Sequence, residues 1–450
     1  MNIKHLLLIS CLCCGTMVLL TSCNDFLDIT PTGKVIAKTG EEYRSLLTYE
    51  YKYFPKDRYL TTVRTDEVIL TAKATSTTDQ DAYLDLWRWK DDDPSVTTTY
   101  FNWRGYYHAI YIANYIIEHR GEIANATQQE VNQLVGEAYM MRAYCHFLLV
   151  NLYAEPYTHC TPASTRGVPI QLSADVNAVP RSSSVEAVFS QVLSDLDQAA
   201  GLMNVRQWES GLNYRFNTTS VAALRARVCL YMGRWQEALD AANNVIAVHA
   251  DIEDLTVTTP QLPNHYKSVE NIVALERFST NEYTVVGMPN PDFMALYRSG
   301  DQRLTQYYKR ATSSRYTLLK GGADELSSSF RSSEAYLTAA EAACRLGRHA
   351  DAVQRLEPLL KHRLNAEAYD EAQALMATMT NDQLLQEILD ERARELAFEG
   401  HRWYDLRRTT RPALQRQWDD QTYTLTPEHY TMRFPTEAVE ANPEIEIWNN

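Results

Sequence analysis

Two groups of aromatic residues are candidate ligand contacts. Trp87 and Trp89 alternate along the chain, so an extended segment would direct both side chains to the same side. Tyr283, Tyr297 and Tyr308 lie in a second stretch that is rich in tyrosine. The flat face of an indole or phenol offers a large apolar surface to a ligand. These side chains are therefore candidate binding residues, although Trp and Tyr are also common packing residues.

No sequence pattern points to catalysis. The chain contains no G-x-S-x-G, no Walker loop, no G-x-G-x-x-G and no H-E-x-x-H. Glycoside cleavage needs two carboxyl groups held roughly 5–10 Å apart across a sugar cleft. Nothing singles out such a pair among the 57 acidic residues. We therefore expect a binding protein rather than an enzyme, with no cofactor.

A run of three acids is the strongest candidate for a metal site. Asp91, Asp92 and Asp93 can supply oxygen ligands to calcium. The run lacks the alternating ligand spacing of an EF-hand, and most acidic runs are solvated loops. We predict a loop without a bound metal.

The stretch from Glu391 to Arg408 is dense in charge and could be mistaken for a catalytic centre. Asp390 and Arg394 are four residues apart, which is ordinary ion-pair spacing on a helix. Arg402 and Asp405 can clamp the end of that helix to the next element. We interpret this stretch as a structural network, in which a buried charge needs a partner.

The overall charge argues against nucleic-acid binding. The chain has 57 acidic and 43 basic residues, a net charge of −14 with histidine neutral. No basic stripe interrupts this acidic surface, so polyanions are poor partners.

The first residues are typical of a secreted lipoprotein. A positive start at Lys4 precedes an apolar stretch from Leu6 to Leu20, which is too short to span a membrane. Leu20, Thr21, Ser22 and Cys23 look like a bacterial lipobox. We expect a signal peptide over residues 1–22 and a lipid on Cys23; the alternative is an ordinary signal peptide with a chance cysteine. Cys145, Cys160, Cys229 and Cys344 are expected to be small core residues rather than a disulfide framework.

Capping signals mark three helix starts. Pairs with capping-box spacing, which satisfies two orphan backbone amides, occur at Thr127 and Glu130, Ser183 and Glu186, and Thr380 and Gln383. Each pair precedes apolar residues at helical spacing. Gly400 is placed to end the last of these helices.

An internal repeat predicts the scaffold. Residues 220–247 and 334–361 share a helix of small residues, a Gly-Arg turn at Gly233 and Gly347, and an alanine at Ala238 and Ala352. This pattern is that of the tetratricopeptide, a helical hairpin that buries its apolar face against its neighbours. Helices near 104–124, 128–153 and 184–203 can supply further hairpins.

Two stretches, about 51–103 and about 251–330, are rich in aromatic residues and lack helical periodicity. Irregular segments carried by a rigid scaffold are common binding surfaces. The predicted fold is therefore mainly α: a tetratricopeptide-like helical-hairpin scaffold, about 30–50, 104–250 and 331–410, with an inserted irregular ligand-binding lobe. We treat residues 23–450 as a single domain.

Four stretches, in order along the chain, resemble the SusD/RagB family of outer-membrane nutrient-binding lipoproteins of Bacteroidetes. They are CNDFLDITPTG, NWRGYYHAIYIANYII, GEAYMMRAYCHFLLVNLYAEPY and ILDERARELAFEGHRWYDLRR, followed by MRFPTEAVEANPEI. In the second, Trp103, Tyr107, Ile110 and Asn114 match the family's spacing.

This resemblance implies a function. Such proteins lie on the cell surface over a TonB-dependent SusC-like transporter, capture oligosaccharides, and deliver them inward. Arg64, Asp66 and Glu67 match the region where family members place polar sugar contacts, and Asp25 and Asp28 resemble the family's surface-export signal.

Two other functions stay open. Some family members take peptides as cargo. A structural adaptor would instead use its helical hairpins to hold transporter components together, with no ligand of its own.

Overall fold

The computed structural model describes residues 37–70, 77–92, 94–278, 287–312, 315–320 and 326–448. The chain divides into two units, Met1–Lys38 and Thr39–Asn450, and all of the elements described here belong to the second. None of the helices in the described ranges is long and apolar enough to cross a membrane.

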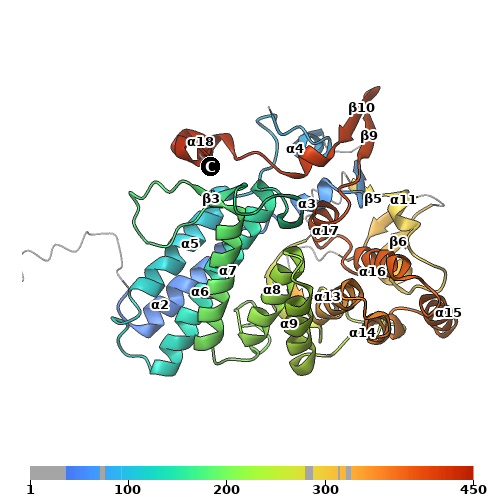
Figure 1. Cartoon of the computed structure of the whole chain (residues 1–450), viewed down its shortest axis with the longest axis horizontal. Coiled ribbons are helices and arrows are strands. Elements are labelled where there is room, and N and C mark those ends of the chain that lie inside the picture. The colour runs from blue at the N-terminus through green and yellow to red at the C-terminus, as the bar shows by residue number, and fades with distance from the viewer. Residues whose placement is uncertain are drawn as a thin grey trace, which may run out of the picture. The chain divides into compact units, whose positions relative to one another are not determined.

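One long helix forms the centre of the N-terminal half. The helix α6 (Gln128–Tyr153) is buried on all sides over most of its length, as expected for a helix that is surrounded by others. It packs against α5 (Trp103–Glu118) and α7 (Val185–Leu202), and α2 (Gly40–Tyr53) lies against α5 and α6 (Figure 1). Thr127 forms the predicted capping box with Glu130 at its start.

The repeated segments form two adjacent helical hairpins. They are α8 (Thr218–Tyr231) with α9 (Trp235–Val248), and α13 (Ser332–Arg345) with α14 (His349–Lys361). Gly233 and Gly347 adopt φ angles of 72° and 73°, which favour glycine at these turns. Because α13 packs against α9 as well as α14, the two hairpins stack side by side (Figure 1). The predicted tetratricopeptide-like scaffold is confirmed.

The remaining helices extend this scaffold. They are α15 (Ala366–Met376), α16 (Asn381–Glu395), α17 (Arg402–Arg408) and the short α18 (Thr436–Ala441). Thr380 caps α16 with Gln383 as predicted. The predicted box at Ser183 is wrong, because Ser182–Ser184 forms strand β3 and Ser184 is the residue that caps α7.

The predicted end of α16 is also wrong. The helix stops at Glu395, before Gly400, and the chain then turns into α17. Gly400 is required by that turn: its φ is 69°, and a Cβ there would lie 2.7 Å from the carbonyl oxygen of Arg58.

The stretches predicted to be irregular contain short elements. The first holds α3 (Leu60–Val63), β1 (Val68–Leu70) and α4 (Thr77–Trp87). The second holds β4 (Asn271–Glu276), β5 (Gly287–Pro289), α11 (Pro291–Met294), α12 (Arg303–Gln306), β6 (Tyr308–Arg310), β7 (Tyr316–Leu318) and β8 (Ser327–Arg331). The antiparallel pair β1–β5 joins the two stretches, with Val68 opposite Pro289.

The other strand pairs are also two-stranded and antiparallel. They are β2 (Arg166–Pro169) with β3, β4 with β8, β6 with β7, and β9 (Leu414–Trp418) with β10 (Gln421–Leu425). The one-turn helices η2 (Tyr157–His159), η3 (Pro427–Tyr430) and η4 (Pro443–Ile445) complete the described elements. The cysteines Cys145, Cys160, Cys229 and Cys344 are free, and all but the half-buried Cys160 lie in the core.

A buried ionic network fastens the second irregular stretch to the helices. The carboxylate of Glu395 in α16 accepts hydrogen bonds from Arg331 at 2.7 Å, Arg363 at 2.8 Å and Arg303 at 3.1 Å. All four side chains are buried. Burial alone would raise the pKa of Glu395, but Arg363 and Arg331 hold it well below its usual value.

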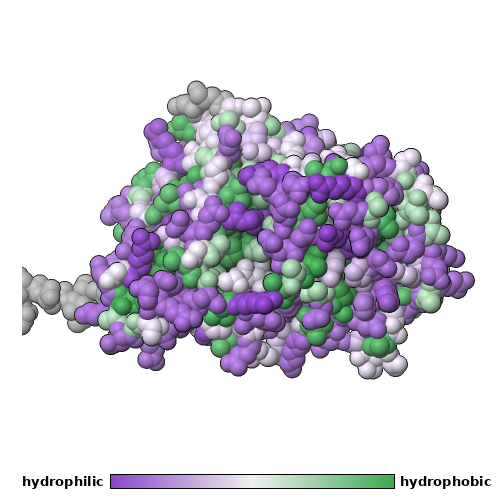
Figure 2. Space-filling model, turned by 60° about the horizontal axis from the view of Figure 1, so that its bottom comes forward, coloured by the Kyte–Doolittle hydropathy of each residue, from purple (hydrophilic) through white to green (hydrophobic). Residues whose placement is uncertain are grey.

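The charged stretch around Glu395 is therefore structural. Its expected pair of Asp390 with Arg394 does not form: Arg394 instead pairs with Glu391 at 2.8 Å and with Glu387 at 2.5 Å. The face of the molecule shown in Figure 2 is mostly polar, with small separated apolar patches.

We predict that Glu395→Gln destabilises the fold strongly. The change leaves three buried arginines without their shared carboxylate, so the free energy of unfolding should fall by about 3–5 kcal/mol. Urea unfolding followed by circular dichroism measures this. The control is Asp197→Asn in the exposed Arg225–Asp197 pair, which should change stability by less than about 1 kcal/mol. Equal unfolding midpoints for the two variants would contradict the role of the network.

Candidate ligand-binding site

The predicted polar residues lie on the segment between α3 and β1. Arg64 is fully buried, and its guanidinium donates two hydrogen bonds to Asp91, at 2.7 and 2.8 Å. The guanidinium also lies 4.8 Å from the ring centroid of Trp403. The guanidinium also donates to the carbonyl oxygen of His429 at 3.4 Å, and the ligand contact of Arg64 stays a prediction.

Asp66 lies nearer the solvent, with 27 % of its side chain exposed. Its two carboxylate oxygens accept hydrogen bonds from Arg402 at 2.9 and 2.7 Å. This bidentate pair holds Asp66 in place at the start of α17. The ligand contact of Asp66 stays a prediction.

Glu67 points inward instead. It accepts hydrogen bonds from the Phe398 backbone N–H at 2.7 Å and from the Thr65 hydroxyl at 3.0 Å. Burial raises the pKa of Glu67 to about 8, so the carboxyl is mostly protonated at neutral pH. Glu67 thus fixes the α3–β1 segment to the turn after α16.

Trp87 and Trp89 are both buried. The segment is not extended as expected: α4 runs to Trp87, and Trp89 has a φ of 58°. The two rings lie 4.8 and 4.2 Å from the guanidinium of Arg416. They support the surface from beneath, and a ligand on the surface has no direct access to either ring.

The predicted tyrosines of the second stretch are also internal. Tyr297 and Tyr308 are buried, with 2.8 Å between their hydroxyl oxygens. The Tyr297 hydroxyl donates to the carbonyl oxygen of Arg394 at 2.8 Å. Burial raises the pKa of both phenols. Tyr283 and Cys23 lie outside the described residues.

A cavity of about 340 Å³ opens beside Asp91, and we name it the aromatic pocket. Tyr100 lines it with 49 % of its side chain exposed, whereas Phe101, Tyr153 and Phe434 are buried. Trp103 packs behind this wall, 5.1 Å from the Tyr153 ring and 5.3 Å from the Phe434 ring. The pocket therefore combines a firm apolar wall with one exposed flat ring.

Charged side chains of both signs surround this ring. Lys90, Asp91, Arg433 and Glu437 line the pocket, and Arg433 also pairs with Asp92 at 2.7 Å across the surface. Two cations and two anions balance, which suits a neutral ligand with many hydroxyl groups. Asp91 and Asp92 each have an arginine partner, and the part of the chain that the structure describes contains no group of acids and histidines placed to hold a metal.

Sequence reasoning missed most of this pocket. Tyr100 was noticeable as an aromatic residue in an irregular stretch, and Arg433 and Phe434 belong to the MRFP motif near the C-terminus. Nothing in the sequence indicated that these two regions meet. Their contact depends on the path of the chain from η3 to α18, which carries Phe434 to the end of α6.

Comparisons with known proteins identify the class of this helical scaffold. A family profile described as "Starch-binding associating with outer membrane" matches residues 25–230, and a profile described as "SusD family" matches residues 258–442. Together the two profiles cover most of the sequence. The chain belongs to the SusD/RagB family.

Solved structures share the same fold. A SusD superfamily protein from Bacteroides thetaiotaomicron has a TM-score of 0.75 at 22 % identity, covering 92 % of this chain and 100 % of its own. One from Bacteroides fragilis has a TM-score of 0.76 at 20 % identity, with the same coverage. A putative sugar binding protein from Bacteroides vulgatus has a TM-score of 0.74 at 20 % identity, covering 92 % of this chain and 99 % of its own.

A curated relative also matches part of the sequence. SusD-like protein P38 from Formosa agariphila is 26 % identical over 259 residues. The match covers 55 % of this chain and 45 % of the relative, so the chain spans less than half of that protein's length.

We predict that Glu67→Gln alters how stability depends on pH. In the wild type the folded state keeps a proton that the unfolded state releases above its ordinary pKa of 4.5. The protonated Glu67 therefore contributes to the stability of the folded state. This contribution is complete below pH 4.5 and is lost as the pH rises through about 8. The amide of glutamine does not titrate, so the melting temperature of the variant should rise relative to the wild type between pH 5 and pH 9.

Thermal melts across this pH range test the prediction. Glu237→Gln, in an exposed pair on α9, is the control and should follow the wild-type profile. Parallel profiles for Glu67→Gln and the wild type would rule out the buried proton.

Proposed function

We propose that this protein binds oligosaccharides at the outer membrane and passes them to a transporter, using the aromatic pocket as its binding site. The observation that carries the proposal is the exposed Tyr100 ring, set over a cavity with charged groups around it. The profile description and the structural neighbour from Bacteroides vulgatus described as a putative sugar binding protein support a carbohydrate as the ligand.

The proposed contacts follow from sugar chemistry. The face of Tyr100 packs against the C–H face of a pyranose ring. Asp91 accepts from sugar hydroxyls, while Lys90 and Arg433 donate to them. An open pocket with few such groups gives modest affinity, which suits a carrier that must release its cargo. We propose binding and release without covalent chemistry.

The residues predicted from the sequence take different proposed roles. Asp66 is a second polar contact near the surface, since part of its carboxylate is exposed. Arg64 and Glu67 are positioning residues that act through Asp91 and the Phe398 turn. Trp87, Trp89, Tyr297 and Tyr308 are buried, so any proposed effect on ligand binding would act through their neighbours, and Tyr283 stays a proposed ligand contact.

The proposed location is the cell surface, with the chain anchored by lipid on Cys23 after removal of residues 1–22. The lipobox pattern supports the anchor, and several acyl chains together hold a protein firmly on a membrane. The proposed partner is a SusC-like TonB-dependent transporter, which receives the glycan. The outer-membrane description of the matching profile supports this location.

Tyr100→Ala should weaken glycan binding about tenfold, which corresponds to about 1.4 kcal/mol. The alanine removes the stacking face but leaves the buried wall behind it, so the melting temperature should stay near that of the wild type. Isothermal titration with neutral oligosaccharides measures the change. Tyr100→Phe keeps the face and should bind nearly as well.

A matched control is Tyr49→Ala on α2, where the side chain is 54 % exposed and lies outside the aromatic pocket. It should leave glycan affinity unchanged. Equal affinities for Tyr100→Ala and Tyr49→Ala would remove the aromatic pocket from the proposal. Saturable binding of peptides instead of glycans would favour a peptide carrier, and binding of neither would favour a structural adaptor.

Cys23→Ala should abolish lipid attachment. Without the thiol no diacylglycerol can be added, so labelled palmitate should appear in the wild type but not in the variant. Cell fractionation should place the variant outside the outer-membrane fraction. A variant that still carries palmitate would show that the anchor lies elsewhere.

A further inference from the structure

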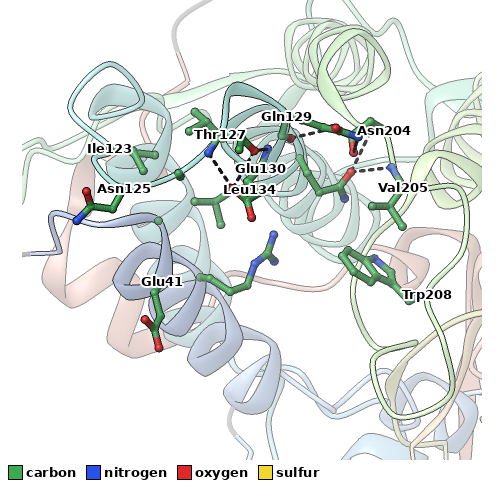
Figure 3. Close-up of a pocket in the computed structure, with 15 residues that line it drawn as sticks. Glu41, Ile123, Asn125, Thr127, Gln129, Glu130, Leu134, Asn204, Val205 and Trp208 are labelled. Carbon is green, nitrogen blue, oxygen red and sulfur yellow. Dashed lines mark hydrogen bonds between the residues drawn. The ribbon is translucent and has the colours of Figure 1, made fainter.

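A second cavity lies at the other end of α6 from the aromatic pocket. It has a volume of about 560 Å³ and lies between the first turn of α2, the start of α6 and the segment after α7; we name it the α2–α6 cleft (Figure 3). A helix rises about 1.5 Å per residue, so Leu134 in this cleft lies roughly 30 Å along α6 from Tyr153 in the aromatic pocket. The two cavities are separate sites.

The cleft contains one large aromatic ring. Trp208 borders it opposite Ile123 and Asn125 (Figure 3). The indole N–H donates to the carbonyl oxygen of Phe216 at 2.9 Å, and the guanidinium of Arg215 lies 5.2 Å from the ring centroid. These two contacts hold the half-buried ring at a fixed angle, which gives the cleft a flat apolar surface.

Planar polar groups line part of the cleft. The guanidinium of Arg44, with 23 % of its side chain exposed, donates to Glu137 at 2.8 and 3.0 Å. A guanidinium has five N–H donors, so this pairing leaves donors for a ligand. The amides of Gln129 and Asn204 add further donors and acceptors.

The cleft is formed in advance of any ligand. The side-chain oxygen of Gln133 accepts hydrogen bonds from the backbone N–H groups of Asn204 and Val205, both at 2.9 Å. The Asn204 amide donates to the carbonyl oxygen of Gln129 at 2.9 Å. These bonds tie the segment after α7 to α6. Little conformational entropy is therefore lost when a ligand binds.

The charges favour a neutral ligand. All of the residues that line the cleft are described, and Arg44 is the cation among them. Its charge is already balanced by the buried Glu137. Glu41 and Glu130 are acidic, and Glu130 accepts from the N–H and hydroxyl of Thr127 at 2.8 Å each. A phosphate, sulfate or carboxylate would meet no unpaired cation in the cleft.

We propose that the α2–α6 cleft is a second carbohydrate-binding site, which holds a neutral sugar unit against Trp208 with its hydroxyl groups on Arg44 and the amides. This inference rests on the proposed function, because it assumes that the protein binds glycans. A flat ring beside planar donors and acceptors matches the two faces of a pyranose: the apolar C–H face and the hydroxyl edge.

Isothermal titration tests the second site. The probes are neutral hexasaccharides of α-1,4-glucose, β-1,4-glucose and β-1,4-mannose, and the one that binds the wild type best is used with the variants. We expect two sites in the wild type. Trp208→Ala should weaken binding at the cleft at least tenfold and leave the aromatic pocket unchanged. Trp208→Phe should keep both sites. Tyr100→Ala should weaken the aromatic pocket and leave the cleft intact.

A second variant, Gln129→Ala, tests the same site in case Trp208→Ala does not fold. Gln129→Ala changes an exposed side chain and should weaken the cleft site several-fold without lowering the melting temperature. A single wild-type site that Tyr100→Ala weakens and both cleft variants leave unchanged would overturn the second site while the proposed function stands. No heat from any hexasaccharide would overturn the proposed function, and the second site with it.

Discussion

The hydrogen bonds to the carboxylate of Glu395 are the contacts on which the packing of the second irregular stretch against the helices most depends. It receives Arg303 from α12, Arg331 from the end of β8, and Arg363 from the residues after α14. Each arginine also pairs with at least one other buried acid, but Glu395 is the carboxylate that all three share, and disrupting a buried ionic network is strongly destabilising. The second irregular stretch therefore cannot shift against the helical scaffold without exposing or stranding charge. This constraint allows segments with little regular structure to present side chains at fixed places.

Smaller versions of the same device surround the candidate site. Arg64 fixes Asp91, Arg402 fixes Asp66, and Arg416 lies between Trp87 and Trp89. In the first two cases a guanidinium holds a partly exposed carboxylate in place, and in the third it packs against two buried rings. Arginine suits this task because its planar fork binds carboxylates in two places and also stacks on aromatic rings.

The sequence predicted the scaffold because its signals are local. A threonine followed three residues later by glutamate or glutamine marks the starts of α6 and α16, and Gly233 and Gly347 mark the hairpin turns. The site depends on contacts between residues far apart in the chain. Trp87 and Trp89 pack against Arg416, and Phe434 lines the pocket with Tyr100, so neither arrangement can be inferred from spacing alone. Asp66 and Arg402, which the sequence assigned to separate roles, are partners.

The length of α6 sets the distance between the two cavities. The helix is buried and firmly packed, so the span between the aromatic pocket and the α2–α6 cleft is constant. A polymer long enough to occupy both cavities at once would bind with higher overall affinity than at either cavity alone. A fragment shorter than this distance would occupy one cavity at a time, with no such increase in affinity. With glycan bound at both proposed sites, the protein would hold long chains more firmly than short ones, which would sort its proposed ligands by size without any change in the chemistry of recognition.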